Sequence, residues 1–212
     1  MDQQAIALLS IAYLGPVQYY SKLFLFPKII IEQYDTYGKQ SYRNRCKIYG
    51  ANGPLTLSIP VQKASQHKVL VKDVKIDYSE DWQKQHWKSI ESAYRSAAFY
   101  EYYCDEIIPF YQKKYDFLID FSKEIQNAVL NCLGIALDIF YTEDFILHGN
   151  NEYIDYRERI HPKKMMDDPN FHVEEYFQVF ADKYGFQSNL SIVDLLFNMG
   201  PDTIEIIKKS CN

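Results

Sequence analysis

Two apolar stretches near the start of the chain, joined by one helical pattern, limit the folds that this sequence can adopt. Residues 5–14, "AIALLSIAYL", form a continuous apolar run, which is typical of a strand buried on both faces. Gly15 and Pro16 end the run, and proline at a first helical position favours a helix over "PVQYYSKLFLF". Pro27 breaks that helix, and "KIIIEQY" follows as a second, β-branched strand. This β-α-β unit predicts an α/β protein with a small parallel core sheet and a right-handed crossover.

A β-hairpin is predicted directly after this unit, at about residues 41–61. The stretch "SYRNRCKIYG" is followed by Asn52 and Gly53, a pair that supplies the positive φ of a tight turn, and then by "PLTLSIPV". In the second strand, apolar residues occupy every second position. One face of the hairpin is therefore expected to be buried.

A largely helical second half follows. Ser79 is expected to cap a helix whose apolar positions recur at three- and four-residue spacing. A last strand is predicted at residues 136–145, "ALDIFYTEDF". Further helices are predicted at residues 101–115, 115–135, 174–186 and 189–200, with a terminal helical turn at residues 201–210.

A polar segment without periodicity, residues 148–172, divides the chain. We expect residues 1–147 to form an α/β core with the hairpin and helices, and residues 148–172 to form a long loop that acts as a lid. Residues 173–212 are expected to pack on this core as a C-terminal helical segment. With 212 residues, 47% of them hydrophobic, the chain is long enough to bury such a core.

Positive charge gathers in one part of an acidic chain. Residues 36–72 contain seven Lys or Arg and no Asp or Glu, so the formal net charge of −5 includes +7 from this stretch and the remainder carries −12. The acidic remainder would repel a nucleic acid, whereas a small anion can bind the positive zone alone. The partner predicted from charge is therefore a small-molecule anion.

No cofactor or metal motif is visible in the sequence. The four cysteines lie far apart and form no C-x-x-C pair, and the histidines of the polar segment have irregular spacing. We expect no cofactor, no metal ion and reduced thiols. Asp2 lies where a signal peptide would carry positive charge, and no run reaches the roughly 18 apolar residues of a membrane helix. These features predict a cytoplasmic protein without a membrane span.

The stretches "SYRNRCKIYGANGPLTLSIPV", "DVKIDYSEDWQKQHWKSIESAYRSAAFYEYY" and "NLSIVDLLFNMGP" together resemble the WbqC-like family of bacterial proteins. The resemblance extends over most of the chain. It implies a role in the biosynthesis of bacterial surface polysaccharides such as O-antigen. A protein of this type would transfer a glycyl, aminoacyl or other acyl group onto a sugar.

One stretch departs from the family pattern. Family members commonly carry His-Gln-Pro at the end of the first strand, whereas this chain reads "SIAYLGP" from Ser10 to Pro16. A catalytic role that depends on that histidine cannot be carried over. This branch of the family either uses another residue or never needed the histidine as a catalyst.

Arg43, Arg45 and Lys47 are the main candidates for binding an anion. In an extended strand they project from one face, while Asn44 and Cys46 project from the other. Arginine offers a bidentate fork and lysine a mobile point charge to a phosphate or carboxylate. A solvated hairpin face fits the same pattern, so both interpretations stay open.

Other candidates lie at the ends of the first two strands and on the first long helix. Tyr13, Glu32 and Gln33 lie where α/β folds place ligands, and the first helix offers N–H groups to an anion. His86 lies on the apolar face of its predicted helix. There it is either a proton-transfer group or a buried neutral imidazole bonded to a backbone carbonyl.

These observations lead to a main hypothesis and an alternative. The main hypothesis is a cytoplasmic WbqC-like transferase that binds a phosphate-bearing anion, such as a sugar nucleotide or an activated acyl donor. The alternative is a non-catalytic ligand-binding or protein-assembly module that uses the aromatic residues 94–103 as a partner surface, and a homo-oligomer is compatible with both. The residues assigned are Arg43, Arg45, Lys47 and Lys39 for the anion, Tyr13, Gln33 and Asn44 for orientation, and His86 and Glu32 for catalysis.

Overall fold

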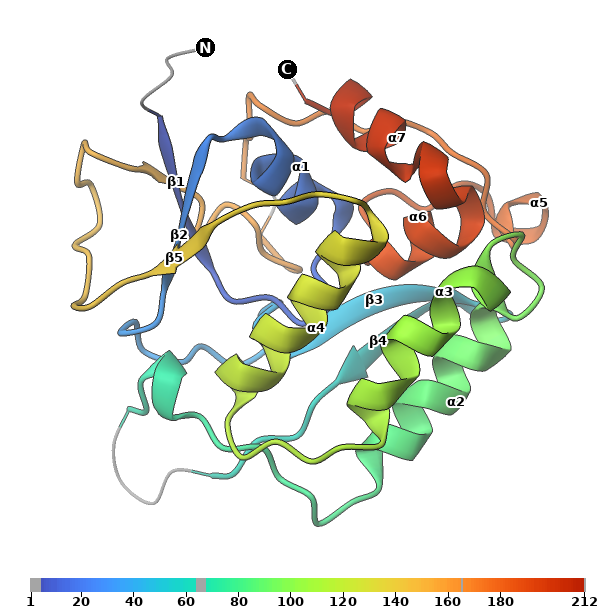
Figure 1. The fold of residues 1–212 in the computed structure, drawn as a ribbon, viewed down its shortest axis with the longest axis horizontal. Helices are drawn as coiled ribbons and strands as arrows, with labels where there is room; N and C mark the ends of the chain where they lie inside the picture. The colour runs from blue at the N-terminus through green and yellow to red at the C-terminus, as the bar shows by residue number, and fades with distance from the viewer. Residues whose placement is uncertain (1–4, 64–67, 165, 212) are drawn as a thin grey trace.

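The predicted β-α-β unit forms the N-terminal part of the structure. The structure is a computed structural model and describes residues 5–63, 68–164 and 166–211. The unit consists of β1 (Ile6–Ser10), α1 (Val17–Leu25) and β2 (Lys28–Glu32). β1 and β2 are parallel and pair along their whole length. In Figure 1 these strands lie on the left of the molecule and most of the helices lie on the right.

The sheet built on this unit has four parallel strands in the order β5-β2-β1-β6. β5 (Ile139–Tyr141) confirms the strand predicted within residues 136–145. β6 (Ile154–Asp155) lies inside the polar segment, where the sequence predicts only loop, because two residues are too few to show a period. The chain passes from β1 to β2 and β5 on one side, and reaches β6 on the other side later. The sheet therefore has a switch point between β1 and β6, the kind of place where open α/β sheets bind ligands.

The predicted hairpin is confirmed as a separate two-stranded antiparallel sheet of β3 (Arg45–Gly50) and β4 (Gly53–Ser58). Gly50 pairs with Gly53, so Ala51 and Asn52 form the turn, and Gly53 alone among these residues has a positive φ, of 102°. The expected alternation holds only in part: Cys46 is buried and Lys47 is exposed, but Ile48 and Tyr49 are both buried, and Leu55 of β4 is 42% exposed. The strands are shorter than the predicted span because residues 41–44 form turns and bends before β3.

The second half is helical, as expected. Its main helices are α2 (Trp82–Tyr94), α3 (Tyr100–Ile107), α4 (Leu118–Cys132), α6 (Ile192–Met199) and α7 (Thr203–Lys209). α2 begins three residues later than its predicted cap, Ser79. The Ser79 N–H donates to the Asp77 carboxylate at 2.9 Å, so a side-chain turn precedes the helix instead.

The helix predicted at residues 174–186 is present only as the short α5 (Ala181–Tyr184). Side-chain hydrogen bonds hold the rest of this segment in irregular conformation. Gln178 donates to the Gln187 carbonyl and accepts from the Gln187 N–H, at 2.8 and 2.9 Å, and the Tyr176 hydroxyl donates to Asp194 at 2.8 Å. These tertiary bonds outweigh local helix propensity.

Helix α6 lies in the middle of the core. Its residues from Ile192 to Asn198 are all buried, and it contacts α1, α2, α3, α7 and β3. Its buried polar residue Asp194 accepts hydrogen bonds from the hydroxyls of Tyr94 and Tyr176. Its fully buried apolar side chains are Ile192, Val193, Leu195, Leu196 and Phe197.

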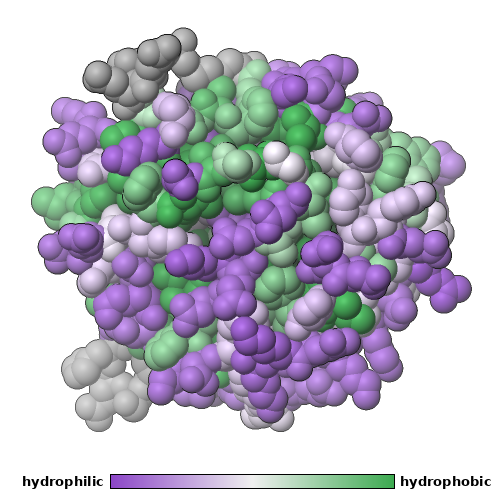
Figure 2. Space-filling model, viewed as in Figure 1, coloured by the Kyte–Doolittle hydropathy of each residue, from purple (hydrophilic) through white to green (hydrophobic). Residues whose placement is uncertain are grey.

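The face seen in Figure 2 is mostly polar and carries an apolar band. This band crosses the upper left of the view, where the chain runs from α4 to β5, while hydrophilic residues predominate in the lower half. Phe140 of β5 is half exposed. The outer edge of the sheet therefore presents apolar surface to solvent.

Candidate functional site

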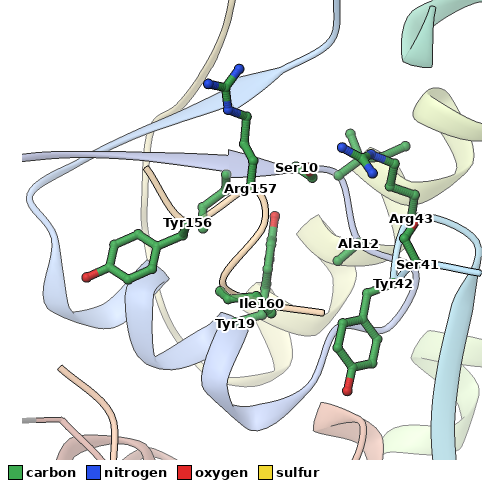
Figure 3. Close-up of a pocket in the computed structure, with 11 residues that line it drawn as sticks. Ser10, Ala12, Tyr19, Ser41, Tyr42, Arg43, Tyr156, Arg157 and Ile160 are labelled. Atoms are coloured by element: carbon green, nitrogen blue, oxygen red, sulfur yellow. The ribbon is translucent and has the colours of Figure 1, made fainter. Parts of the chain in front are cut away.

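A small pocket lies at the switch point between β1 and β6, beyond the carboxyl ends of these strands. Its walls come from four parts of the chain: the end of β1, helix α1, the turn before β3 and the segment after β6. Its free volume is about 10 Å³, which is about the space that one buried water needs. This switch-point pocket is lined by Leu9, Ser10, Ile11, Ala12, Tyr19, Ser41, Tyr42, Arg43, Tyr156, Arg157 and Ile160 (Figure 3).

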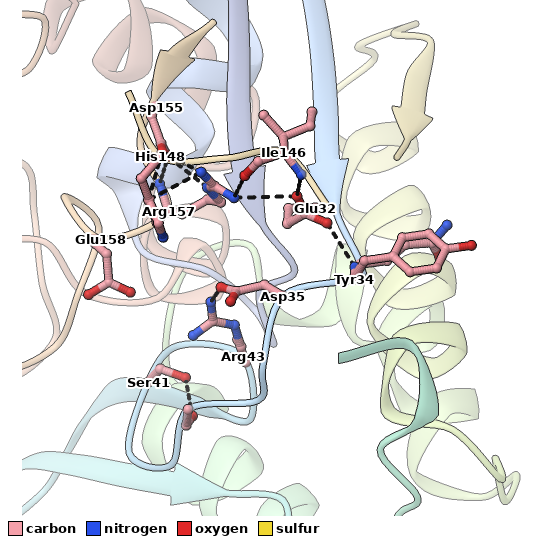
Figure 4. Close-up of polar contacts among 12 residues, drawn as sticks. Glu32, Tyr34, Asp35, Ser41, Arg43, Ile146, His148, Asp155, Arg157 and Glu158 are labelled. Carbon is pink, nitrogen blue, oxygen red and sulfur yellow. Dashed lines mark hydrogen bonds and ion pairs between the residues drawn. The ribbon is translucent and has the colours of Figure 1, made fainter. Parts of the chain in front are cut away.

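Arg157, which follows β6, forms one wall of the pocket and is fully buried. Its Nε and Nη2 donate to the two Asp155 oxygens at 3.0 and 2.6 Å, and its Nη1 donates to the Ile146 carbonyl at 2.8 Å. Burial alone would raise the pKa of Asp155, but the hydrogen bonds from Arg157 outweigh it and hold the pKa below 3.8. All three guanidinium nitrogens have partners, so the charge of Arg157 is balanced within the protein (Figure 4).

Glu32, the last residue of β2, completes this network and is 1% exposed. Its Oε1 accepts from the Tyr34 N–H and the Thr142 hydroxyl, at 2.8 and 2.9 Å. Its Oε2 accepts from the Ile146 N–H at 2.8 Å and from Arg157 Nη1 at 3.3 Å. Four donors occupy the acceptor positions of this carboxylate, so its placement favours a positioning role, and a catalytic role stays a prediction.

Arg43 forms the opposite wall and differs from Arg157 because its donors are not all used. It is 5% exposed, and its Nη2 donates to Asp35 at 2.8 Å, the one side-chain bond that it makes with residues the structure describes. Its Nε is buried without a partner. An unpaired buried N–H is costly unless a water or ligand accepts from it. Arg43 is therefore the cation of this pocket that is free to bind an anion.

Ser10, at the end of β1, adds a second unpaired group. Its hydroxyl oxygen is buried and has no hydrogen-bond partner among the described residues. In Figure 3 Ser10 lies between the side chains of Arg43 and Arg157. One oxygen of a carboxylate or phosphate would fill the free volume and could accept hydrogen bonds there.

The three predicted cations do not share one strand face, because β3 begins at Arg45 and Arg43 precedes it. Arg45 is half buried with an unpaired Nε, and Lys47 is exposed on the same strand. Arg43 and Arg45 both act on Tyr37: burial raises the pKa of Tyr37 to about 12, and the two guanidinium charges oppose this shift. The structure thus groups Arg43 with Arg45 near Tyr37.

Of the other anion-site candidates, Lys39 is exposed and Asn44 and Gln33 bind backbone groups. Asn44 Nδ2 donates to the Ile59 carbonyl at 2.8 Å, and its Oδ1 is buried without a partner among described residues. Gln33 Nε2 donates to the Thr142 carbonyl at 2.6 Å. None of the three lines the switch-point pocket as the structure describes it, and their binding roles stay predictions.

Tyr13 and His86 lie together in the aromatic core, away from the lining of the switch-point pocket. The Tyr13 hydroxyl is 2.9 Å from His86 Nδ1 and 2.7 Å from the Tyr111 hydroxyl. Burial lowers the pKa of His86 to about 4, so the imidazole is neutral at pH 7. This placement agrees with the buried neutral imidazole that the sequence allows, while its catalytic role stays a prediction.

The N-terminus of α1 is occupied by the chain itself. The Val17 N–H donates to the Leu190 carbonyl at 3.0 Å, and the Gln18 N–H donates to Asn189 Oδ1 at 2.9 Å. These two N–H groups, which the sequence analysis considered as donors to an anion, therefore already donate to acceptors within the protein.

The aromatic segment proposed as a partner surface is divided between the core and the solvent. Tyr94 and Tyr100 are buried, whereas Tyr102 is 77% exposed. Tyr94 donates a hydrogen bond to Asp194 of α6, so it belongs to the core.

Sequence reasoning missed Arg157 and Asp35 and treated Ser10 only as a strand residue. Arg157 lies in the polar segment after the two-residue β6, which gives no periodic signal. Asp35 follows the second strand at the same sheet end as Glu32, a position that could have marked it. Whether the Ser10 hydroxyl finds a hydrogen-bond partner depends on packing, so it could not be predicted from the sequence.

In the described ranges, no group of three or more His, Cys, Asp or Glu side chains is placed to hold a metal ion. No helix in those ranges is long and apolar enough to cross a membrane.

The fold is that of an α/β protein with a small pocket at the switch point of its parallel sheet. The model of the WbqC-like protein family matches residues 12–169, and the chain belongs to this family. The uncharacterized protein Rv1507c of Mycobacterium tuberculosis (strain ATCC 25618 / H37Rv) is 24% identical over 227 residues, which cover 96% of this chain and 97% of that protein. No solved structure matches the chain significantly.

Proposed function

We propose that this protein is a cytoplasmic transferase that binds an anionic substrate with its charged end in the switch-point pocket. The substrate would be a sugar nucleotide or an activated acyl donor used in bacterial surface-polysaccharide biosynthesis. The observation that carries the proposal is the pair of unpaired buried groups, Arg43 Nε and Ser10 Oγ, at one pocket. Structural polar groups in a folded protein are normally paired, so this pair indicates a missing ligand or water.

The surrounding residues support this proposal because some have all their polar atoms paired and one keeps a free donor. Arg157 and Glu32 are saturated with partners and so fix the walls (Figure 4). Arg43 is held by Asp35 at one nitrogen only, which orients its fork and leaves Nε for the ligand. A preorganised binding site needs both features: neighbouring residues held in place by their partners, and a donor that is still free for the ligand.

The free volume admits only the tip of a ligand, so the rest of the substrate must lie outside the pocket. His161 follows Ile160, a lining residue of the pocket, and lies within electrostatic range of Arg43 and Glu158. Burial and neighbouring cations lower the pKa of His161 below 6.5, so it is neutral at pH 7. The Lys163 N–H donates to His161 Nδ1 at 3.1 Å, so the neutral ring carries its proton on Nε2 and can donate a hydrogen bond to a substrate oxygen.

Calorimetry on pocket variants tests the proposal. A thermal-shift screen of sugar nucleotides, acyl phosphates and simple carboxylates first finds the best ligand. Arg43→Ala should then weaken its binding about tenfold or more, the loss expected for a charge-assisted hydrogen bond. Arg95→Ala, the same change at an exposed position at the end of α2, should bind like the wild type.

Ser10→Ala separates binding from folding. It removes an unpaired buried hydroxyl, so the protein should be as stable as the wild type or slightly more stable. Its affinity for the ligand should nevertheless be lower. Unchanged affinity in both Ser10→Ala and Arg43→Ala would overturn the proposal. Loss of stability in Ser10→Ala without loss of affinity would assign Ser10 to the fold alone.

A further inference from the structure

A larger hollow, the lysine groove, shares a loop with the switch-point pocket. Residues 41–43 of this loop line the pocket, while Thr36, Tyr37 and Lys39 line the groove. The groove has a volume of about 660 Å³, within the range of small-molecule sites. Its other described lining residues are Val61, Gln62, Lys63, Lys68, Val69, Asp73, Val74 and Lys75.

Backbone hydrogen bonds hold the walls of the groove in place. The Tyr37 N–H donates to the Val69 carbonyl at 2.8 Å, and the Gln62 N–H donates to the Lys75 carbonyl at 2.9 Å. These bonds join the loop before β3 and the segment after β4 to residues 69–75. The groove is therefore a formed feature of the fold.

The groove carries positive charge that the protein does not balance. Its four lysines, Lys39, Lys63, Lys68 and Lys75, are exposed and form no ion pair with any residue the structure describes. Its carboxylate, Asp73, accepts from Lys72 Nζ at 2.9 and 3.0 Å. Residues 36–72 contain no Asp or Glu, so no nearby part of this stretch can neutralise the lysines.

Tyr37 connects the groove with the arginines behind it. Its side chain is half buried and interacts electrostatically with Arg43 and Arg45. The pKa of Tyr37, raised by burial to about 12, keeps the hydroxyl neutral, and its oxygen has no hydrogen-bond partner among the described residues. A neutral hydroxyl donates to a phosphate oxygen, whereas a phenolate would repel it.

We infer that the lysine groove binds the diphosphate group of a small phosphoanhydride ester, in contact with Lys39, Lys63, Lys68 and Tyr37. Two linked phosphates offer more charge and more acceptor oxygens than one, which matches several lysines spread around one hollow. A charged cleft also concentrates such an anion at its mouth. This inference goes beyond the proposed function, because it adds a diphosphate site apart from the switch-point pocket.

Titration of inorganic pyrophosphate at low salt tests this inference. The wild type should bind pyrophosphate more tightly than inorganic phosphate, and binding should weaken as salt is added. The double variant Lys39→Ala/Lys68→Ala should bind pyrophosphate about tenfold more weakly or worse, since two charge-assisted contacts are lost. The control Lys84→Ala/Lys88→Ala removes two exposed lysines of α2 and should change nothing.

The outcomes separate this inference from the proposed function. If Lys39→Ala/Lys68→Ala binds pyrophosphate like the wild type, or if the wild type binds none, the groove is not a diphosphate site. If Arg43→Ala keeps full ligand affinity while the lysine variant loses pyrophosphate, the switch-point proposal fails and the groove stands. Uridine diphosphate and farnesyl diphosphate, titrated in parallel, distinguish a nucleotide ligand from a lipid one.

Discussion

At the scale of single residues, the buried polar groups of this protein fall into two kinds. Glu32 and Arg157 have partners at every nitrogen or oxygen, whereas Arg43 and Ser10 each keep a buried atom without one. Burial is the same in both kinds, so burial alone does not mark a site. Seven described residues keep such an atom, and Ser10 and Arg43 are the two of them that line the switch-point pocket.

His86 makes the stability of the protein depend on pH. Its pKa is about 4 in the folded chain and about 6.5 in the unfolded chain, so the unfolded state binds a proton first as the pH falls. The stabilising contribution is complete above pH 6.5 and is lost between pH 6.5 and 4, by about 3 kcal/mol. His86→Asn should remove this pH dependence, as measured by urea unfolding at several pH values.

The comparison must be made as a difference between wild type and variant at each pH. Burial raises the pKa of Asp194 to about 6, so Asp194 contributes the opposite slope between pH 4 and 6. This contribution is common to both proteins and cancels in the difference. A wild-type-minus-variant difference that stays constant from pH 7 to 4.5 would show that His86 is not held neutral.

At the scale of elements, Gly200 ends α6 in a conformation that suits only glycine. Its φ is 54° and its ψ is −122°, and a Cβ added there would lie 2.4 Å from the Phe99 ring. Gly200→Ala should therefore cost about 3 kcal/mol or more, from strain and from the clash together. Urea unfolding with far-UV circular dichroism measures this loss.

Gly134, which ends α4, is the matched control. It also has a positive φ, of 65°, but a Cβ there would meet nothing within 4 Å. Gly134→Ala should cost only about 1 kcal/mol, for the backbone conformation alone. Equal losses in the two variants would mean that Phe99 moves away and that the contact does not limit the end of α6.

The elements with a strong local signal were predictable. Continuous apolar runs identified β1 and β2, and regular spacing identified α2, α4 and α6. β6 and the irregular residues before α5 were not predictable, because partners distant in sequence determine them. Of the site, the end of β2 and the cation Arg43 were predicted, but Arg157 and the free state of Ser10 required the three-dimensional arrangement.

At the scale of the whole molecule, Lys22 of α1 ties the polar segment to the core. Lys22 is fully buried, and its Nζ lies 2.9 Å from Asp168 Oδ2 and donates to the Asn170 carbonyl at 2.7 Å. Gln18 also donates to Asp168, at 2.8 Å. With β6 paired to β1 and Asp168 bound to α1, the segment expected to be a lid is fixed at two points.

Lys22→Met tests this connection. The change leaves Asp168 buried without its cation, a loss expected to cost about 3–5 kcal/mol in the free energy of unfolding. Lys28→Met, at an exposed position of β2, should change stability by no more than about 0.5 kcal/mol. A Lys22→Met protein as stable as the wild type would show that the ion pair contributes no net stability.

The central position of α6 has a consequence for biosynthesis. A ribosome releases α1 and the hairpin long before residues 192–199, yet both α1 and β3 pack against α6. The growing chain therefore carries uncovered apolar surface for most of its synthesis, the condition that recruits chaperones and favours aggregation. Expression conditions that slow translation near the end of the chain will prolong this exposed stage.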